Sequence, residues 1–254
     1  MAQTALITGA SSGIGRALAL QFAAHGYDLV LVARDATALD EVARSVSTRV
    51  HVVSADLSEV HAARVVLEQA ARHGPVDVVV NNAGFGLRGE FAELPLERQL
   101  EMIHLNVVAL TELTRLLLPD MLSRHRGGVL NVASTAAFQP GPLMAVYYAT
   151  KAYVLSFTEA IAEEVAGSGL KVSCLCPGPT ATGFATRAGM TDAQVFTGDV
   201  MDVTRVAQEG FDGWNAGRVT VVPGFGNRRG AFLVRLAPRA MVRRIVKRLN
   251  GSGS

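Results

Sequence analysis

The sequence predicts an α/β protein with a doubly wound parallel sheet of about seven strands and helices on both faces. Apolar runs alternate with helical patterns along nearly all of the 254 residues, and this alternation requires right-handed crossovers between parallel strands. Hydrophobic residues make up 49% of the chain, and the mean hydropathy of +0.27 suits strands that are buried on both faces. A chain of this length fits one large core.

The elements follow one another in a regular order. We expect strands at 4–8, 28–33, 50–54, 76–80, 128–133, 170–176 and 219–222. We expect helices at 14–25, 36–46, 58–72, 96–122, 145–167 and 204–216. The irregular stretch 180–202 follows a strand and is a candidate substrate lid. Residues 1–226 should form one domain, and 227–254 a basic extension that is not a separate domain.

A glycine-rich turn joins the first strand to the first helix. Glycines allow a sharp turn and a close backbone approach to a ligand, and the helix N-terminus offers free N–H groups to a pyrophosphate. The three glycines follow the pattern Gly-x3-Gly-x-Gly, rather than the common Gly-x-Gly-x2-Gly. The strand–turn–helix context makes this turn a candidate dinucleotide phosphate site, with the residues Thr8, Gly9, Ser11, Ser12, Gly13, Ile14 and Gly15.

The end of the second strand bears on which cofactor is bound. An acidic residue at this point favours the ribose hydroxyls of NAD, whereas a nearby Arg accommodates the 2′-phosphate of NADP. Ala33 occupies the acidic position and Arg34 follows it, so we predict NADP, with Arg34 on the phosphate. Asp35 leaves the alternative open, because a shift of one residue would reverse the preference.

Tyr147 and Lys151 are four residues apart in a predicted helix, so both lie on one face. Ser134 lies just past the carboxyl end of the fifth strand. A tyrosine is a poor acid or base at neutral pH, but a neighbouring ammonium lowers its pKa. The three side chains therefore form a candidate proton-transfer centre.

Together these motifs make the chain resemble a single-domain short-chain dehydrogenase/reductase, with a Rossmann-like fold, over nearly its whole length. Further matches are an adenine-contacting pair after the third strand, a signature after the fourth strand, a catalytic Asn, and a nicotinamide-side motif after the sixth strand. In this sequence they are Asp56 and Leu57; Asn81, Asn82, Ala83 and Gly84; Asn106; and Pro177, Gly178 and Thr182.

The resemblance implies a role for each member of the set. Tyr147 is the general acid in reduction and the base in oxidation, and Ser134 hydrogen-bonds the substrate oxygen. Lys151 binds the nicotinamide ribose and lowers the pKa of Tyr147, and Asn106 holds a water that relays protons from Lys151. Tyr147 and Lys151 thus also contact the cofactor. Tyr148, which has no Lys four residues later, is left to pocket or core packing.

The function that follows is an NADP(H)-dependent oxidoreductase that interconverts a carbonyl and an alcohol. A non-catalytic NADP-binding sensor or scaffold and a sugar-nucleotide epimerase or dehydratase are the alternatives, and the latter usually carries a larger C-terminal domain. The expected substrate is hydrophobic, since the expected pocket residues are apolar and no charge clamp is evident. These residues are Phe85, Leu87, Phe138, Leu143, Met144 and Phe184.

Several features indicate the compartment. Cys174 and Cys176 lie two apart in one strand, so we expect both to be buried and reduced rather than bound to a metal. Met1 leads almost directly into the first strand, and no uninterrupted apolar run is long enough to span a bilayer, so we expect neither a signal peptide nor a spanning helix. We therefore expect a cytoplasmic protein.

The C-terminal segment differs from the rest in charge. From Gly213 onward there are nine Lys and Arg and no Asp or Glu, while the preceding residues carry 15 basic and 22 acidic ones, a net of −7. After Pro238 the pattern predicts a basic amphipathic helix, which could cover the core, pack on a second subunit or touch a membrane surface. No aromatic residues interleave the charges, so we expect no nucleic-acid partner.

The length of this extension also bears on assembly. Many members of the resembled family follow the last strand with a short loop that closes a tetramer, whereas here about 30 residues follow it. We therefore expect a homo-oligomer, with a dimer favoured over the usual tetramer.

Overall fold

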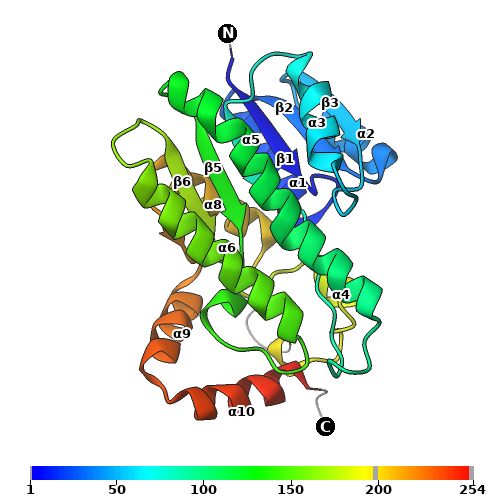
Figure 1. The fold of residues 1–254 in the computed structure, drawn as a ribbon, viewed down its shortest axis with the longest axis vertical. Coiled ribbons are helices and arrows are strands. Elements are labelled where there is room, and N and C mark those ends of the chain that lie inside the picture. The colour runs from blue at the N-terminus through cyan, green and yellow to red at the C-terminus, as the bar shows by residue number, and fades with distance from the viewer. Residues whose placement is uncertain (1, 197–199, 252–254) are drawn as a thin grey trace.

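Seven parallel strands form one sheet in the computed structural model, which describes residues 2–196 and 200–251. The order β3-β2-β1-β4-β5-β6-β7 confirms the predicted doubly wound sheet (Figure 1). All neighbouring pairs are parallel. The strands are β1 (Thr4–Thr8), β2 (Asp28–Ala33), β3 (Val50–Ser54), β4 (Val78–Asn81), β5 (Gly128–Val132), β6 (Lys171–Leu175) and β7 (Thr220–Val221).

Helices cover both faces of the sheet, as the alternation predicted. One face carries α1 (Gly13–Ala24), α2 (Ala36–Arg44) and α8 (Val203–Asn215), which pack on Ile7 and Leu31. The other carries α3 (Ala62–Ala71), α5 (Leu110–Ser123) and α6 (Ala145–Glu164), which pack on Leu6 and Val30. Successive side chains of β1 and β2 thus enter opposite cores, and for this reason the strands read as continuous apolar runs.

A long helix packs across β4 and β5 on one face of the sheet. It consists of α4 (Leu96–Ile103), a π-helical segment (His104–Ala109) and α5. By length and composition alone, the span Leu96–Ser123 could cross a membrane. Leu113 and Met121 are fully buried in the core beneath the sheet, as expected for a helix of a globular core.

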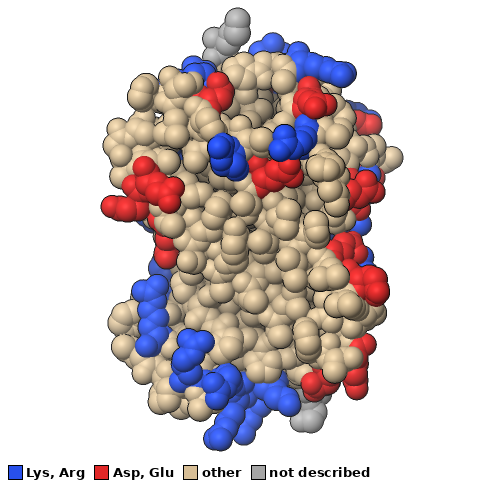
Figure 2. All heavy atoms as spheres, viewed as in Figure 1, with Lys and Arg blue, Asp and Glu red and all other residues tan. Residues whose placement is uncertain are grey.

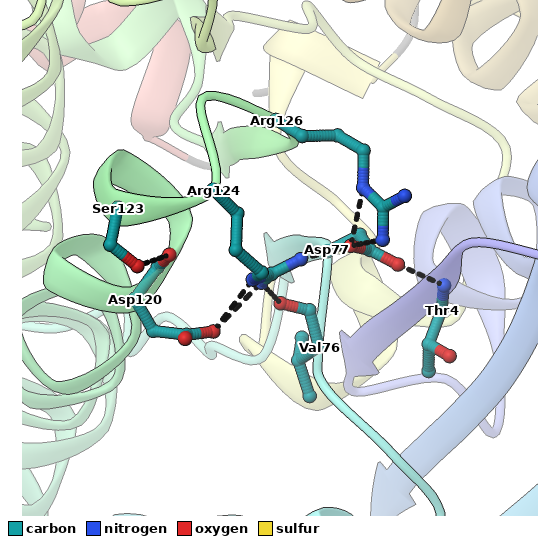
Figure 3. A network of polar contacts seen from close by, with 7 residues as sticks. All are labelled: Thr4, Val76, Asp77, Asp120, Ser123, Arg124 and Arg126. Carbon is teal, nitrogen blue, oxygen red and sulfur yellow. Dashed lines mark hydrogen bonds and ion pairs between the residues drawn. The ribbon is translucent and has the colours of Figure 1, made fainter.

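The amino ends of the central strands are fastened by a buried carboxylate (Figure 3). Asp77, 2% exposed, accepts a hydrogen bond of 2.9 Å from the backbone N–H of Thr4 at the start of β1. It also pairs with Arg124 and Arg126, which precede β5, and Arg126 Nη2 lies 2.9 Å away. This network joins β1, β4 and β5 at the edge of the sheet opposite to their carboxyl ends.

The C-terminal segment forms two helices, α9 (Phe225–Leu236) and α10 (Arg239–Asn250), which lie below the sheet in Figure 1. The helix predicted after Pro238 is observed as α10. Helix α9 was not predicted, and the expected boundary at residue 226 falls inside it. On α10, Val242 and Val246 are buried against the cluster that contains Tyr147 and Tyr148.

The predicted lid, 180–202, is tied at both ends, since Thr180 bridges to Met201. It includes the short helix α7 (Phe184–Arg187), and Met190 and Ala193 are buried. Residues 197–199 of the predicted lid lie outside the described residues. Its opening and closing therefore stay a prediction.

Candidate active site

A cleft of about 540 Å³ runs along the carboxyl ends of the strands. It crosses the point between β1 and β4 where the strand order reverses, the usual ligand site of an open α/β sheet. Most of the predicted site residues line it: Gly9, Ser11, Ser12, Gly13, Ile14, Arg34, Asp56, Leu57, Asn82, Ala83, Gly84, Ser134, Tyr147, Lys151, Pro177, Gly178 and Thr182. Thr8, Gly15 and Asn106 are not in this lining.

The glycine-rich turn forms a cradle at the start of α1. Gly9 and Gly13 have positive φ angles of 65° and 54°, which L side chains rarely adopt. A Cβ on Gly15 would lie 2.2 Å from the carbonyl oxygen of Gly9, so Gly15 permits close packing rather than ligand contact. The side chain of Ser12 makes no capping hydrogen bond, which leaves the first N–H groups of α1 open to an anion. This geometry fits the pyrophosphate of a dinucleotide.

Thr8 lies beneath this turn instead of in the cleft. Its Oγ1 accepts hydrogen bonds of 3.0 Å from the backbone N–H groups of Asn82 and Ala83. Asn82 Nδ2 in turn donates to the carbonyl oxygens of Thr8 and Gly9, at 2.9 and 3.2 Å. The two side chains therefore fasten the loops after β1 and β4 to each other and hold the cradle in shape.

At the ends of β2 and β3, Arg34 Nη1 lies 3.5 Å from Asp56 Oδ2. The Arg34 side chain is 70% exposed, so this pair is weak and can exchange for another anion. Burial would raise the pKa of Asp56, but hydrogen bonds from Ser58 and the charge of Arg34 hold it below its usual value. Asp35 caps α2 by accepting from the N–H of Ala38 at 3.0 Å.

The candidate acid–base set lies in the middle of the cleft. Ser134 and Tyr147 both line the cleft, the Ser134 side chain acts to lower the pKa of the Tyr147 phenol, and Tyr147 is 9% exposed. Lys151 Nζ donates to the carbonyl oxygen of Val132 at 2.8 Å and lies 5.8 Å from the centre of the Tyr147 ring. Helix α6 thus brings Tyr147 and Lys151 beside the end of β5.

Burial sets the proton affinities of both groups. It raises the pKa of Tyr147, and the Ser134 side chain opposes the rise only in part. Burial also lowers the pKa of Lys151 to about 8. Burial is the largest cause of the rise at Tyr147 and Lys151 is not among its causes, so the expected lowering of the Tyr147 pKa by Lys151 stays a prediction. At neutral pH, Tyr147 therefore holds its proton.

Asn106 lies in the π-helical segment, 1% exposed, behind Lys151 and Gly84. Its Nδ2 donates to Phe85 O at 3.0 Å and to Thr150 Oγ1 at 3.1 Å, and its Oδ1 accepts from Phe85 N at 3.2 Å. These bonds join the loop after β4 to α6. Thr150 was not predicted, since a Thr inside a helix carries no sequence signal of its own.

The nicotinamide-side motif meets the unpredicted helix α9. A Cβ on Gly178 would lie 2.3 Å from Asn227 Oδ1, so only glycine fits beneath this side chain. Thr182 faces the phosphate cradle, because a Cβ on Gly13 would lie 3.3 Å from the Thr182 side chain. The motif thus lies between the cradle and the C-terminal segment.

The substrate end of the cleft agrees with the prediction only in part. Phe85, Met144 and Phe184 line it as expected. Leu87 and Leu143 instead line a small neighbouring pocket. Phe138 faces Arg235 of α9, whose guanidinium lies 5.9 Å from the ring centre. Lining residues that sequence reasoning missed are Arg98, Glu101, Gln139, Arg187, Met190, Val195, Phe196, Leu249 and Asn250.

These additional lining residues change the expected charge and boundaries of the pocket. Arg98 and Arg187 add positive charge to the lining, whereas no charge clamp for the substrate was evident from sequence, although Arg98 is paired with Glu101. Leu249 and Asn250 come from α10, so the C-terminal helix forms part of the wall. Among residues 2–196 and 200–251, no cluster of three or more His, Cys, Asp or Glu could hold a metal ion.

Comparison with known proteins agrees with this geometry. The family model for short chain dehydrogenases matches residues 3–193. The chain belongs to this family. It is 36% identical over 177 residues to an uncharacterized oxidoreductase of Staphylococcus epidermidis, covering 69% of this chain and 77% of that one. It is therefore an NAD(P)-dependent dehydrogenase or reductase.

The solved structures that resemble this chain include several with a nicotinamide cofactor. A short-chain dehydrogenase from Sphingobium yanoikuyae in complex with NADPH superposes with a TM-score of 0.82 at 32% identity, over 92% of this chain and 93% of that one. A 3-ketoacyl-(acyl-carrier-protein) reductase from Brucella melitensis complexed with NADH gives 0.77 at 30% identity, over 87% and 96%. These two neighbours support nicotinamide binding without choosing between the two cofactors.

Proposed function

We propose that this short-chain dehydrogenase uses NADP(H) to interconvert a carbonyl and an alcohol on a hydrophobic substrate, with Tyr147 as the acid and base. The observation that carries the proposal is that Ser134 and Tyr147 line the same cleft, with the buried Lys151 beside the Tyr147 ring. A binding protein without catalysis would need the phosphate cradle but not this pair.

In the proposed reaction, the cofactor supplies or accepts the hydride. Ser134 donates a hydrogen bond to the substrate oxygen and stabilises the negative charge that develops there. Tyr147 gives its phenolic proton to the same oxygen as the alcohol forms. Because burial favours the protonated phenol, the resting site is set for reduction. Lys151 places a positive charge near the phenolate left after transfer, and Asn106 holds the loop after β4 against α6.

The NADP preference is supported by the ends of β2 and β3. Asp35 is engaged in capping α2, so Ala33 is left at the position where NAD-binding folds place an acid. Arg34 is exposed and held only by a weak ion pair, so its guanidinium is available to a 2′-phosphate. The hydrophobic substrate is supported by Phe85, together with the other apolar residues of the cleft.

Replacing Tyr147 by Phe tests the mechanism. The ring and its packing stay, while the transferable proton is lost, so turnover should fall about 100-fold or more, the usual size of general acid–base effects. Binding of NADPH, followed by fluorescence, should be largely retained. If Tyr147→Phe turns over a carbonyl that the parent enzyme reduces at nearly the parent's rate, Tyr147 is not the acid and base, and the proposed mechanism is wrong.

Assembly and location are proposed on separate observations. Leu100, Ile103 and Val108 are 50%, 37% and 42% exposed along α4 and the π-helical segment, an apolar face that fits a second copy of the chain. We therefore propose a homodimer, which sedimentation equilibrium checks. Cys174 and Cys176 are free and fully buried, which suits the reducing cytoplasm.

A further inference from the structure

Helices α9 and α10 leave large apolar side chains in contact with solvent. Phe225, Phe232, Leu236, Met241 and Ile245 are 75%, 62%, 70%, 55% and 42% exposed. We call these five residues the α9–α10 surface. A run of exposed apolar residues of this size on two successive helices indicates that the surface meets a partner.

On α10 the exposed and buried residues form two neighbouring stripes. Met241 and Ile245 are four residues apart and exposed, while Val242 and Val246, one position later, are 5% and 2% exposed. The buried stripe holds the helix on its own domain, so the exposed stripe is not needed for that contact. Arg244 follows Met241 by three positions and therefore lies beside the exposed stripe.

The surface is surrounded by positive charge. After Gly226 the sequence has eight Lys and Arg and, like the whole chain after Asp212, no Asp or Glu. All eight basic side chains are exposed, and blue atoms gather at the lower end of the molecule in Figure 2, where α9 and α10 lie. Within residues 2–196 and 200–251, one ion pair includes any of these eight basic side chains, and it joins Arg228 to Glu209 at 3.7 Å.

This charge argues against a second copy of the chain as the partner. A two-fold symmetric contact would bring the same patch of both copies together, and the eight positive charges of one would face the eight of the other. The segment has no acidic residue that could neutralise them. The partner that fits is apolar at its centre and negatively charged at its surface.

We propose that the α9–α10 surface docks on an anionic lipid bilayer. Its Phe and Leu side chains enter the interface, while the basic residues contact the headgroups. The wall of the cleft belongs to the same helix, because Leu249 and Asn250 line it. Docking therefore brings the substrate end of the cleft to the bilayer, where a hydrophobic carbonyl compound is concentrated.

Co-sedimentation of the full-length protein with vesicles tests this. Vesicles of phosphatidylcholine with phosphatidylglycerol should bind the protein, and binding should weaken as salt is raised. Vesicles of phosphatidylcholine alone should not. The variant R244Q/K247Q/R248Q should bind about 100-fold more weakly, since each basic residue near an anionic surface contributes roughly a fivefold factor.

The matched control removes three exposed arginines that lie outside α9 and α10, in α2, after α3 and in α5. This variant, R44Q/R72Q/R115Q, should bind within about twofold of the parent. A second variant, F232S/L236S, keeps the charge and should also lose binding. Both α9–α10 variants should retain turnover of a water-soluble carbonyl, so loss of binding is distinct from loss of the proposed activity.

Three results would overturn the proposal. The first is a parent protein that ignores anionic vesicles at low salt. The second is equal weakening of binding in R244Q/K247Q/R248Q and in the control. The third is a change of oligomeric state in F232S/L236S, which would make the surface a subunit contact.

Discussion

Asn250 connects the C-terminal helix to the active site, and its truncation to Ala should loosen both. It is fully buried at the end of α10. Its Nδ2 donates to the carbonyl oxygen of Pro142 at 3.0 Å, and its Oδ1 accepts from the hydroxyl of Tyr148 at 3.1 Å. Tyr148 is the neighbour of Tyr147, with 6.1 Å between the ring centres. Leu143, the residue after Pro142, has a positive φ of 67°, so the bond to Pro142 supports a strained turn.

The magnitude follows from the two groups that lose their partner. A buried polar group without a hydrogen bond costs about 1–3 kcal/mol. Truncation to Ala opens a space beside the cleft that water can enter, so we expect the lower part of this range, for a total of about 2–4 kcal/mol. For a chain of this size, such a loss lowers Tm by roughly 5–10 °C.

Two measurements check the expectation. Hydrogen exchange of residues 239–250 should speed up, because α10 loses an anchor at its end. KM for an apolar carbonyl should rise several-fold as the wall loosens, while kcat should stay within about twofold because Tyr147 is unchanged. Tyr148→Phe removes one of the two bonds from the other side, so N250A and Y148F should be non-additive when combined. Unchanged exchange and an unchanged KM in N250A would refute the anchoring role.

Two further changes test other parts of the molecule. We expect the parent protein to bind NADPH about 10- to 100-fold more tightly than NADH, which corresponds to a charge-assisted bond of about 1.5–3 kcal/mol, and Arg34→Ala should erase most of this preference. Ala33→Asp should favour NADH, because the new carboxylate repels the 2′-phosphate. Equal dissociation constants for the two cofactors in the parent protein would contradict the reasoning. Asp77→Asn should lower the free energy of unfolding by about 2–4 kcal/mol, less than for a fully buried pair because Arg124 and Arg126 are 22% and 51% exposed. At temperatures below its Tm, the D77N variant should turn over substrate normally, because the Asp77 network lies at the opposite end of the strands from the cleft. Denaturant unfolding measures the loss of stability, and a kinetic assay measures turnover.

The sheet could be predicted because each of its strands is marked locally. The apolar runs of β1, β2 and β6 are buried on both faces, and Gly9, Arg34 and Pro177 stand at or just after their ends. Strand β7 is only two residues long, so the predicted run 219–222 was longer than the ladder that forms. Helix α3 begins at Ala62 rather than near residue 58, because Asp56 accepts from the N–H of Ser58 in a turn before it.

The grouping of the candidate site residues in one cleft could be expected for a related reason, since most of them come in short motifs just after strands. Thr8 and Asn106 show the limit of this reasoning. Their motifs mark them as part of the site, but only the folded chain shows that their side chains are directed at other loops, to Asn82 and Ala83 in one case and to Phe85 in the other. A motif gives the neighbourhood of a side chain and not the atom that it contacts.

Helix α9 was missed because its sequence carries mixed signals. Gly226 and Gly230 lie within it, and glycine disfavours helix by roughly 1 kcal/mol per residue relative to alanine. Its contacts offset this cost, since Arg235 lies over Phe138 and Asn227 packs on Gly178. Such contacts join residues far apart in the chain, and no local pattern records them.

The same long-range contacts make the substrate end the least predictable part of the site. The cofactor half is built from turns that directly follow strands, whereas the substrate half is assembled from α4, the segment after β6 and the end of α10. A substitution in α10 that leaves the cradle untouched can therefore change which substrates enter. If the α9–α10 surface meets a bilayer, this half of the cleft also faces the lipid, so substrate choice and membrane contact would depend on one helix. Asn250 is where the two meet, since it lines the cleft and also anchors the helix that carries Met241 and Ile245.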